Sequence, residues 1–233
     1  MARALFWLML VVGLPGGALA LFWLMTLPDV AVLAKTNPSS TALIEARAAA
    51  ARKDGHRFAP QRTWVALSEI SPHLQRAVIV SEDAAFFHHE GFDWEGIKEA
   101  AAKNLWRGDL ARGGSTITQQ VAKNLFLSAD KSFLRKAREA LITRALEHRL
   151  SKKRILEIYL NIAEWGRGIF GAEAAARHHF HKPASELTAE EAALLAAMLP
   201  SPLRYDPLRM TPYLIKRQHQ ILALMQPDHE DGR

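Results

Sequence analysis

Apolar residues recur along most of this chain at intervals of three and four positions, the spacing of one face of an α-helix. The most regular stretch spans residues 134–150, where Leu134, Leu141 and Ala145 share one apolar stripe. Residues 62–67 instead favour a weak strand or an extended segment, and no other stretch alternates as a strand would. Comparable helical patterns cover residues 41–53, 72–83, 94–107, 118–126, 152–165, 172–180, 189–198 and 212–226. The sequence therefore predicts a mainly α-helical domain.

Capping residues mark the start of several predicted helices. Ser71 precedes Pro72, a favoured pair for the N-cap and the first helical position. Thr188 opens a capping box before a very apolar helix. Glu82 lies near the C-terminal end of the helix that Pro72 begins. The helix dipole disfavours a negative charge there, which predicts a raised pKa for Glu82.

The N-terminal apolar run has a different pattern, because no charged residue occurs between Ala4 and Leu27. A helix of that length can cross a hydrocarbon core of about 30 Å. Small residues ending at Ala20 resemble a signal-peptidase site, so a cleaved signal is the alternative. The run continues beyond that site, which favours a retained anchor. Arg3 is the only charge before the run, and this places the N-terminus in the cytoplasm and the rest of the chain outside it.

Four segments follow from these patterns. Residues 1–28 form a cytoplasmic tip and transmembrane anchor, and residues 29–61 form a linker with one short helix. Residues 62–226 form the main domain, and residues 227–233 form a flexible tail. The chain has no cysteine, which excludes disulfides and thiolate metal sites. An extracytoplasmic domain of this kind must be stabilised by its hydrophobic core.

Positive charge is concentrated in one part of the chain. The net charge is +6, and residues 131–154 alone contain nine basic and two acidic residues, or +7. Beside a membrane anchor, such a block suggests contact with anionic lipid head groups or a phosphorylated lipid, and less readily with nucleic acid. The alternative is that these charges lie on solvated helix faces.

Two polar stretches interrupt the apolar pattern and carry the candidate chemistry. The first polar island, residues 81–92, has the sequence SEDAAFFHHEGF and places carboxylates and histidines among phenylalanines. Such a mixture can shift the pKa of a carboxylate. The second polar island, residues 113–124, has the sequence GGSTITQQVAKN and offers hydroxyls, amides and one lysine. It is suited to hydrogen-bonding a polar ligand.

By residue type alone, a carboxylate-centred acid–base site is the best hypothesis. Glu82 lies among aromatic residues, and Glu139 follows Arg135 and Lys136 at helical spacing. The alternative for Glu82 is an ordinary helix-end carboxylate. The alternative for Glu139 is a surface ion pair worth roughly a few tenths of a kcal/mol.

Other motifs favour structural roles. The adjacent His88 and His89 cannot share a helix face as zinc ligands would, and the histidines at 178, 179 and 181 have no nearby carboxylate pattern. The glycines at 166, 168 and 171 have the spacing of a dinucleotide fingerprint but follow a predicted helix. Ser128 and Lys131 match one acyl-transfer motif without its companions. We therefore expect no metal site held by these residues.

Several motifs, in order, resemble those of one family. They are Glu82-Asp83-x-x-Phe86-x-x-His89-x-Gly91, the whole second polar island, Arg135-Lys136-x-x-Glu139, Lys152-x-x-Ile155-Leu156-Glu157-x-Tyr159-Leu160-Asn161, and a looser Gly166-x-Gly168-x-x-Gly171-x-Glu173. The chain is thereby similar, over about residues 64–207, to the monofunctional biosynthetic peptidoglycan glycosyltransferases of glycosyltransferase family 51. The same domain occurs in class A penicillin-binding proteins. One departure is His179-Phe180-His181-Lys182, where the family commonly has an aromatic-Phe-Gly-Lys run.

The resemblance implies a lysozyme-like, mostly helical glycosyltransferase domain after one N-terminal transmembrane helix. It also implies a small hydrophobic subdomain that dips into the membrane, for which residues 105–135 are the candidate. The catalytic domain would then lie on the periplasmic side of the inner membrane, attached by a single span.

The implied reaction joins lipid II units through β-1,4 bonds, inverts the donor's anomeric centre and releases undecaprenyl pyrophosphate. Glu82 would be the general base, and Glu139 the second catalytic carboxylate. Lys123, Arg135 and Lys136 would stabilise the pyrophosphate. The further substrate-binding residues implied by the family are Asp83, Ser115, Thr116, Gln119, Gln120 and Asn124. No cofactor is required, although a divalent cation such as Mg²⁺ can share the pyrophosphate's charge.

Implied partners are lipid II, the growing lipid-linked glycan, the membrane, and other cell-wall synthases or division proteins, but not nucleic acid. A hydrolase on the same fold, with Glu82 as general acid, is the first alternative. The cations near Glu139 count against it, because hydrolysis of a neutral glycosidic bond produces no pyrophosphate. A non-catalytic membrane-anchored partner of the same machinery is the second alternative. Carboxylates left unpaired near buried rings would have no purpose in such a protein.

Overall fold

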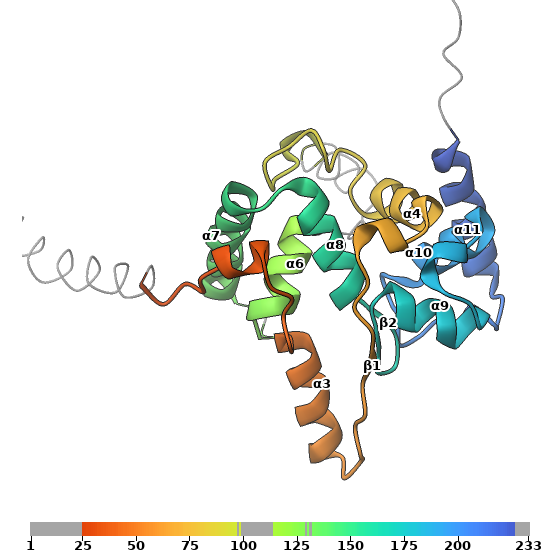
Figure 1. Cartoon of the computed structure of the whole chain (residues 1–233), viewed down its shortest axis with the longest axis horizontal. Helices are drawn as coiled ribbons and strands as arrows, with labels where there is room; N and C mark the ends of the chain where they lie inside the picture. The colour runs from red at the N-terminus through yellow and green to blue at the C-terminus, as the bar shows by residue number, and fades with distance from the viewer. Residues whose placement is uncertain (1–24, 97, 99–113, 129, 131, 227–233) are drawn as a thin grey trace, which may run out of the picture.

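The computed structural model describes residues 25–96, 98, 114–128, 130 and 132–226. This part of the chain is mainly helical, as predicted (Figure 1). Its α-helices are α3 (Ala42–Lys53), α4 (Pro72–Glu82), α6 (Ile117–Phe126), α7 (Phe133–Arg149), α8 (Lys152–Ile162), α9 (Ala172–Phe180), α10 (Ala189–Met198) and α11 (Pro212–Met225). Short 3₁₀ helices are η2 (Ala31–Ala34), η3 (Leu67–Glu69) and η4 (Ala184–Glu186), and the strands are β1 (Gln61–Arg62), β2 (Glu164–Gly166) and β3 (Ile169–Phe170).

The predicted helix starts are confirmed by their caps. The Ser71 hydroxyl accepts from the backbone N–H of His73, and Pro72 follows it as the first residue of α4. Thr188 and Glu191 form the reciprocal capping box of α10. Each such bond satisfies a backbone donor that the first turn of a helix leaves free. Of the helix predicted over 94–107, residues 97 and 99–107 lie outside the described residues.

Two predictions about residues 152–171 and 62–67 were wrong in detail. The helix expected to reach residue 165 ends at Ile162, and the chain then forms the β2–β3 hairpin. Gly171, at φ +86°, also lies so close to α8 that a Cβ atom would be 2.9 Å from the Asn161 carbonyl oxygen. The expected strand is confined to β1, which pairs parallel with β3. Beyond it, Val65 hydrogen-bonds through both its N–H and its carbonyl to the Asn161 side chain, so a side chain takes the place of a neighbouring strand.

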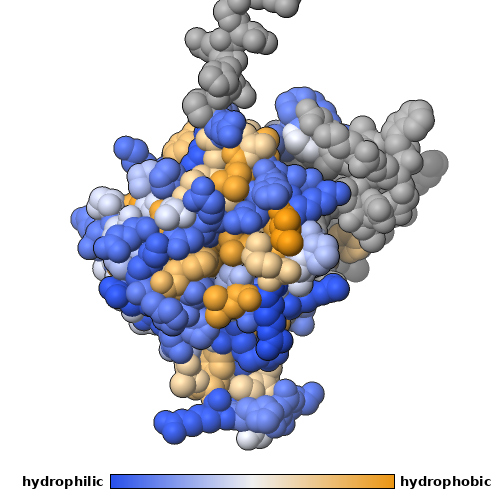
Figure 2. All heavy atoms as spheres, turned by 90° about the vertical axis from the view of Figure 1, so that its right-hand side faces the viewer, coloured by the Kyte–Doolittle hydropathy of each residue, from blue (hydrophilic) through white to orange (hydrophobic). Residues whose placement is uncertain are grey.

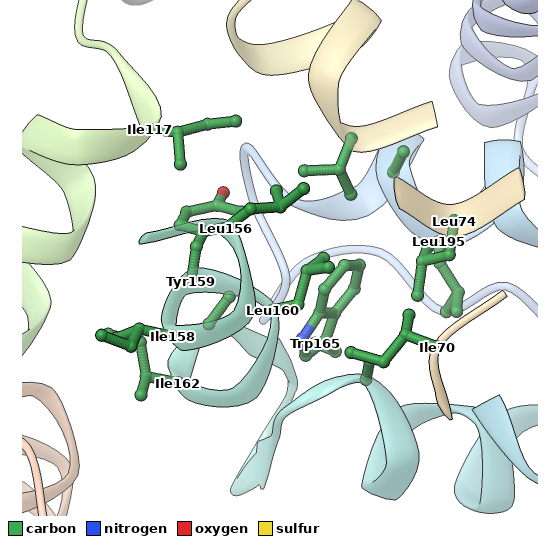
Figure 3. Packing of buried hydrophobic residues seen from close by; sticks show 14 of the residues in the cluster. Ile70, Leu74, Ile117, Leu156, Ile158, Tyr159, Leu160, Ile162, Trp165 and Leu195 are labelled. Atoms are coloured by element: carbon green, nitrogen blue, oxygen red, sulfur yellow. The ribbon is translucent and has the colours of Figure 1, made fainter. Parts of the chain in front are cut away.

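Helix α8 lies at the centre of the domain. It packs on α6, while α4 packs on α10 and α11 to form the other half of the core. Figure 3 shows Leu160 of α8 beside Trp165, with Leu74 and Leu195 beyond it, while the Tyr159 ring points toward Ile117 of α6. Tyr159 and Trp165 are among the largest fully buried side chains. Burying one large apolar side chain stabilises a fold by about 1.5–3 kcal/mol, so these buried residues contribute to the stability of the domain.

The surface over α9, α10 and α11 is mostly hydrophilic, with separate apolar groups between the polar ones (Figure 2). Scattered exposure of this kind is usual on soluble domains and does not by itself mark an interface.

Three predicted segments fall wholly or partly outside the described residues. They are the anchor over residues 4–27, the membrane-dipping subdomain over 105–135 and the tail over 227–233. Within the described ranges, no helix combines the length and the apolar character needed to span a membrane.

Candidate active site

Asp83 joins the two polar islands. Its Oδ2 accepts from the backbone N–H of Ile117 at 2.9 Å, and its Oδ1 lies 2.9 Å from His89 Nε2. His89 Nδ1 accepts from the N–H of Gly91, so Nε2 is the nitrogen that donates to Asp83. The Asp83 side chain is only 1% exposed. Asp83, predicted to bind substrate, therefore uses both oxygens inside the protein to fix the start of α6 against the end of α4.

Thr116 and Gln119 make a second link between the islands. The Thr116 hydroxyl donates to the carbonyl of Gly91 at 2.7 Å and accepts from the N–H of Gln119. The Gln119 Oε1 atom accepts from the N–H of Thr116, which completes a capping box for α6. Both residues are buried, so these two predicted substrate contacts form the internal start of α6. Ser115, one residue earlier, is partly exposed.

The first polar island also packs closely on α7. A Cβ atom at Gly91, whose φ is +90°, would lie 2.7 Å from Thr143 Cγ2. Glu147 of α7 accepts from the Thr118 hydroxyl and from Lys152 Nζ. Lys152 in turn lies over the Phe86 ring, with its Nζ 4.6 Å from the ring centre. These contacts explain why the motif residues occur together, and they include Glu147, which the sequence interpretation missed.

Glu82 is the partly buried carboxylate at the edge of this assembly. Its Oε2 accepts a hydrogen bond from Gln120 Nε2 at 2.8 Å. Burial raises the pKa of Glu82, while the Gln120 hydrogen bond and the charges of Arg217 and Lys123 oppose that rise. The predicted direction of the pKa shift is confirmed, with loss of solvent as its main cause. A carboxylate of raised pKa that remains partly open to solvent is a better proton acceptor than an ordinary glutamate.

Two groups near Glu82 come from distant parts of the chain and were not predicted. The Tyr159 hydroxyl donates to Gln120 Oε1 at 3.1 Å. Arg217 of α11 donates from Nη2 to the Ser81 carbonyl at 3.2 Å, beside the candidate base. Neither the fourth motif nor the last helix revealed these contacts, because both depend on how α8 and α11 pack on α4 and α6.

Glu139 is buried in a cationic cluster. It is 2% exposed, accepts from Arg135 Nη1 at 2.6 Å, and is also paired with Lys136 Nζ. The alternative of a surface ion pair is therefore wrong for Glu139, although both cations lie on its own helix. A buried carboxylate is stable only when it is paired in this way. Its two partners retain exposed side-chain area, 18% for Arg135 and 48% for Lys136, so both can also meet a ligand.

Lys123 connects the two carboxylates electrostatically. Desolvation by the surrounding protein lowers its pKa, although the side chain reaches solvent. Glu139 and Glu82 act in the opposite direction, and Arg135 lowers the pKa further. Lys123 therefore interacts electrostatically with both Glu82 and the Glu139 cluster.

A groove adjoins the cationic end of this site. Its volume is about 410 Å³, and it lies between α3 and the α6–α7 region. The α3 side contributes Ala42, Leu43 and Ala46, and the facing side contributes Lys123, Asn124 and Arg135. The predicted ligand contacts thus divide into groups at a surface, including Lys123, Asn124 and Arg135, and groups inside the fold.

The side chains of the described residues include possible metal ligands. In the described part of the chain, no three side chains of histidine, aspartate or glutamate gather as metal ligands would. The site's chemistry is that of two carboxylates, four cations including Arg217, and amides.

The family model described as Transglycosylase matches residues 49–226, a range that contains both polar islands, Glu139 and α8. The chain therefore belongs to the transglycosylase family, and the family indicated by the motifs is confirmed. It is an enzyme of that class, a transglycosylase.

Several known proteins are similar in sequence to most of this chain. A protein of Nitrosospira multiformis is 53% identical over 189 residues, covering 81% of this chain and 82% of its own length. One of Methylobacillus flagellatus is 48% identical over 225 residues, covering 97% of each chain. One of Dechloromonas aromatica is 48% identical over 221 residues, covering 94% of this chain and 95% of its own. Each bears the name "Biosynthetic peptidoglycan transglycosylase".

Proposed function

We propose that this enzyme polymerises the glycan strands of peptidoglycan, joining lipid II units through β-1,4 bonds and releasing undecaprenyl pyrophosphate. The names of its relatives support the peptidoglycan substrate. The observation that carries the proposal is a charged site in which Lys123 lines one groove with Arg135 and interacts electrostatically with Glu82 and Glu139. A proton acceptor and a set of cations for a leaving anion lie together in it.

Glu82 acts as the general base. The 4-hydroxyl of the acceptor sugar must lose its proton as it attacks C1 of the donor, and the bond from C1 to the pyrophosphate breaks with inversion. An ordinary glutamate, with a pKa of about 4.3, is a weak base at neutral pH. The raised pKa of Glu82 improves its match to this step, and the Gln120 hydrogen bond keeps the carboxylate in place.

The cations act on the leaving group. Negative charge builds on the pyrophosphate as its bond to the donor sugar breaks, and fixed positive charges lower the energy of that state. Lys123, Arg135 and Lys136 supply them, and buried Glu139 holds Arg135 and Lys136 in position. Glu139 thereby serves catalysis by organising the cluster. A Mg²⁺ ion can share the pyrophosphate's charge, but no set of protein ligands in the described residues requires one.

The remaining predicted contacts divide by exposure. We assign Ser115, Gln120 and Asn124, which are all partly exposed, to hydrogen bonds with sugar and phosphate oxygens. Asp83, Thr116 and Gln119 act indirectly, because their polar groups position α6 and with it Gln120 and Lys123.

The proposed setting is the periplasmic face of the inner membrane. The charge-free run from Ala4 to Leu27 supports a single retained anchor, and lipid II itself is a membrane lipid. Residues 105–135 remain the candidate for a membrane-dipping part, and other cell-wall synthases or division proteins remain the proposed partners.

The test is incubation of the full, detergent-solubilised protein with labelled lipid II, followed by separation of products by size. We expect long glycan from the parent protein and from Glu190→Gln, which changes an exposed carboxylate outside the site. Glu82→Gln should keep its fold and its lipid II binding but make no glycan. Shortening of preformed glycan by the parent, with lipid II untouched, would instead support the hydrolase.

A further inference from the structure

Three side chains lead from Glu82 into the core of the domain. Gln120 Nε2 donates to Glu82 at 2.8 Å, and the Tyr159 hydroxyl donates to Gln120 Oε1 at 3.1 Å. The three residues belong to different helices, α4, α6 and α8. We propose that Tyr159 is a positioning residue for Glu82, because its hydroxyl holds the acceptor end of the Gln120 amide while the donor end faces the carboxylate. This inference rests on the proposed function only in treating Glu82 as the base.

The asymmetry of the glutamine side chain is the reason. An amide has a donor end and an acceptor end, and a rotation of half a turn exchanges them. A tyrosine hydroxyl that donates to Oε1 leaves the NH₂ group facing Glu82. Tyr159 is 1% exposed, and its burial raises the pKa well above the ordinary value, so the hydroxyl keeps its proton. Without that hydroxyl, the Gln120 oxygen loses its hydrogen-bond donor, and the amide is free to rotate away from Glu82.

Other charged groups near Glu82 also affect its pKa, in addition to the Gln120 hydrogen bond. Arg217 from α11 and Lys123 from α6 favour the charged carboxylate, while Asp83, the next residue after α4, disfavours it. Burial favours the neutral form more strongly than any of these. The Gln120 N–H is the strongest of the influences that favour the charged form. Loss of its orientation should therefore raise the pKa of Glu82 further.

The experiment is a titration of the full chain in detergent with ¹³C-labelled glutamate side chains, in which the Glu82 signal is identified by its loss in Glu82→Gln. In Tyr159→Phe we expect the Glu82 pKa to rise by about half a unit to one unit, since one net hydrogen bond is worth about 1 kcal/mol. Tyr205→Phe, which removes a hydroxyl outside this chain of side chains, should leave the titration unchanged. An unshifted Glu82 titration in a folded Tyr159→Phe protein would overturn the inference.

The pH dependence of kcat/KM separates positioning from a general structural defect. A base must be deprotonated to act, so a higher pKa moves the acidic limb of the profile to higher pH. Tyr159→Phe should thus be slower than the parent by about three- to tenfold on that limb and approach the parent at higher pH. A uniform loss of rate at every pH would show that Tyr159 serves only the packing of the core.

A double-mutant cycle tests whether Tyr159 affects the Glu82 pKa through Gln120. Once Gln120→Met has removed the amide, adding Tyr159→Phe should shift the Glu82 pKa no further, whereas additive shifts would contradict a route through the amide. A measurement on the parent protein covers the case in which Tyr159→Phe does not fold. The side-chain NH₂ resonances of Gln120 should then titrate with the Glu82 pKa, and an unresponsive amide would overturn the inference.

Failure of this inference differs from failure of the proposed function. If Glu82→Gln still makes glycan while Tyr159→Phe shifts the Glu82 titration, the positioning holds and the assignment of the base is wrong. If Glu82→Gln is inactive while the titration in Tyr159→Phe is unshifted, the base assignment holds and the positioning is wrong.

Discussion

The carboxylate of Asp83 accepts a hydrogen bond from the backbone N–H of Ile117 at 2.9 Å, and this bond joins the last turn of α4 to the first turn of α6. Glu82 and Gln120 lie on the two helices that it connects, and they are themselves 2.8 Å apart between Oε2 and Nε2. The position of the candidate base relative to its amide partner therefore depends on a neighbouring residue that does not face solvent.

Replacing Asp83 with asparagine should lower the free energy of unfolding by about 1–3 kcal/mol. Asparagine has one acceptor oxygen, so it can satisfy either the Ile117 N–H or His89 Nε2, but not both. Denaturant unfolding measures the change. Asp54→Asn, at an exposed helix end, is the control and should change stability by less than about 0.5 kcal/mol. Equal stability of the two variants would show that the Asp83 link is unimportant.

Glu82→Gln should be more stable than the parent protein at neutral pH. The pKa of Glu82 is raised in the folded state, so folding favours the protonated form. As pH rises through the window from the ordinary pKa to the raised one, the folded state holds the extra proton and the parent loses stability. Glutamine removes that loss, and the advantage should vanish below the ordinary glutamate pKa of about 4.3. Unfolding curves across this pH range test the sign, and a variant that is less stable at neutral pH contradicts it.

Glu139→Gln should destabilise the fold by about 1–3 kcal/mol, because Arg135 and Lys136 lose a buried anionic partner. Polymerisation should slow as well, since the two cations are no longer fixed. Thermal unfolding and the lipid II assay measure the two effects on one preparation. The exposed Glu186→Gln provides the comparison. If Glu139→Gln polymerises lipid II as fast as the parent protein, although Arg135 and Lys136 are no longer held in place, these cations do not act on the leaving group.

His181→Gly should stabilise the protein by about 0.5–1 kcal/mol. His181 follows α9 at φ 57°, ψ 29°, the left-handed conformation that costs an ordinary residue roughly 1–2 kcal/mol and glycine little. The family's usual glycine at this position thus has a conformational reason, and histidine adopts the same conformation here. His178→Gly, an exposed position inside α9, should instead cost about 0.5–1 kcal/mol. Melting temperatures of both variants check the opposite signs.

Helices were predictable from the sequence because their signals are local. Ser71 and Thr188 each act within a few residues of themselves. The apolar stripe predicted on α7 was wrong as the core face, because Leu134 and Leu141 are exposed. The buried residues of α7 are Glu139, Ile142, Thr143 and Leu146. The β2–β3 hairpin was missed because its strands are only two or three residues long and wholly buried, which leaves no alternating pattern.

The candidate site was predictable in its residue types but not in its division of roles. The motifs placed Glu82 and Glu139, yet spacing could not show that Glu139 is buried or that Asp83, Thr116 and Gln119 are internal. The groups around Glu82 could not be predicted either, because they lie far from it in the sequence. Tyr159 contacts Gln120 across 39 positions, and Arg217 contacts Ser81 across 136 positions. Such contacts arise only when the helices have packed.

The proposed reaction is best tested by counting its two products. Purified full-length protein would be given lipid II, and the β-1,4 bonds formed would be compared with the undecaprenyl pyrophosphate released. We expect one pyrophosphate for each bond in the parent protein, and neither product from Glu82→Gln. Bond formation at the parent rate by Glu82→Gln would contradict the proposed role of Glu82. Pyrophosphate release by the parent without any glycan would contradict the proposed polymerisation.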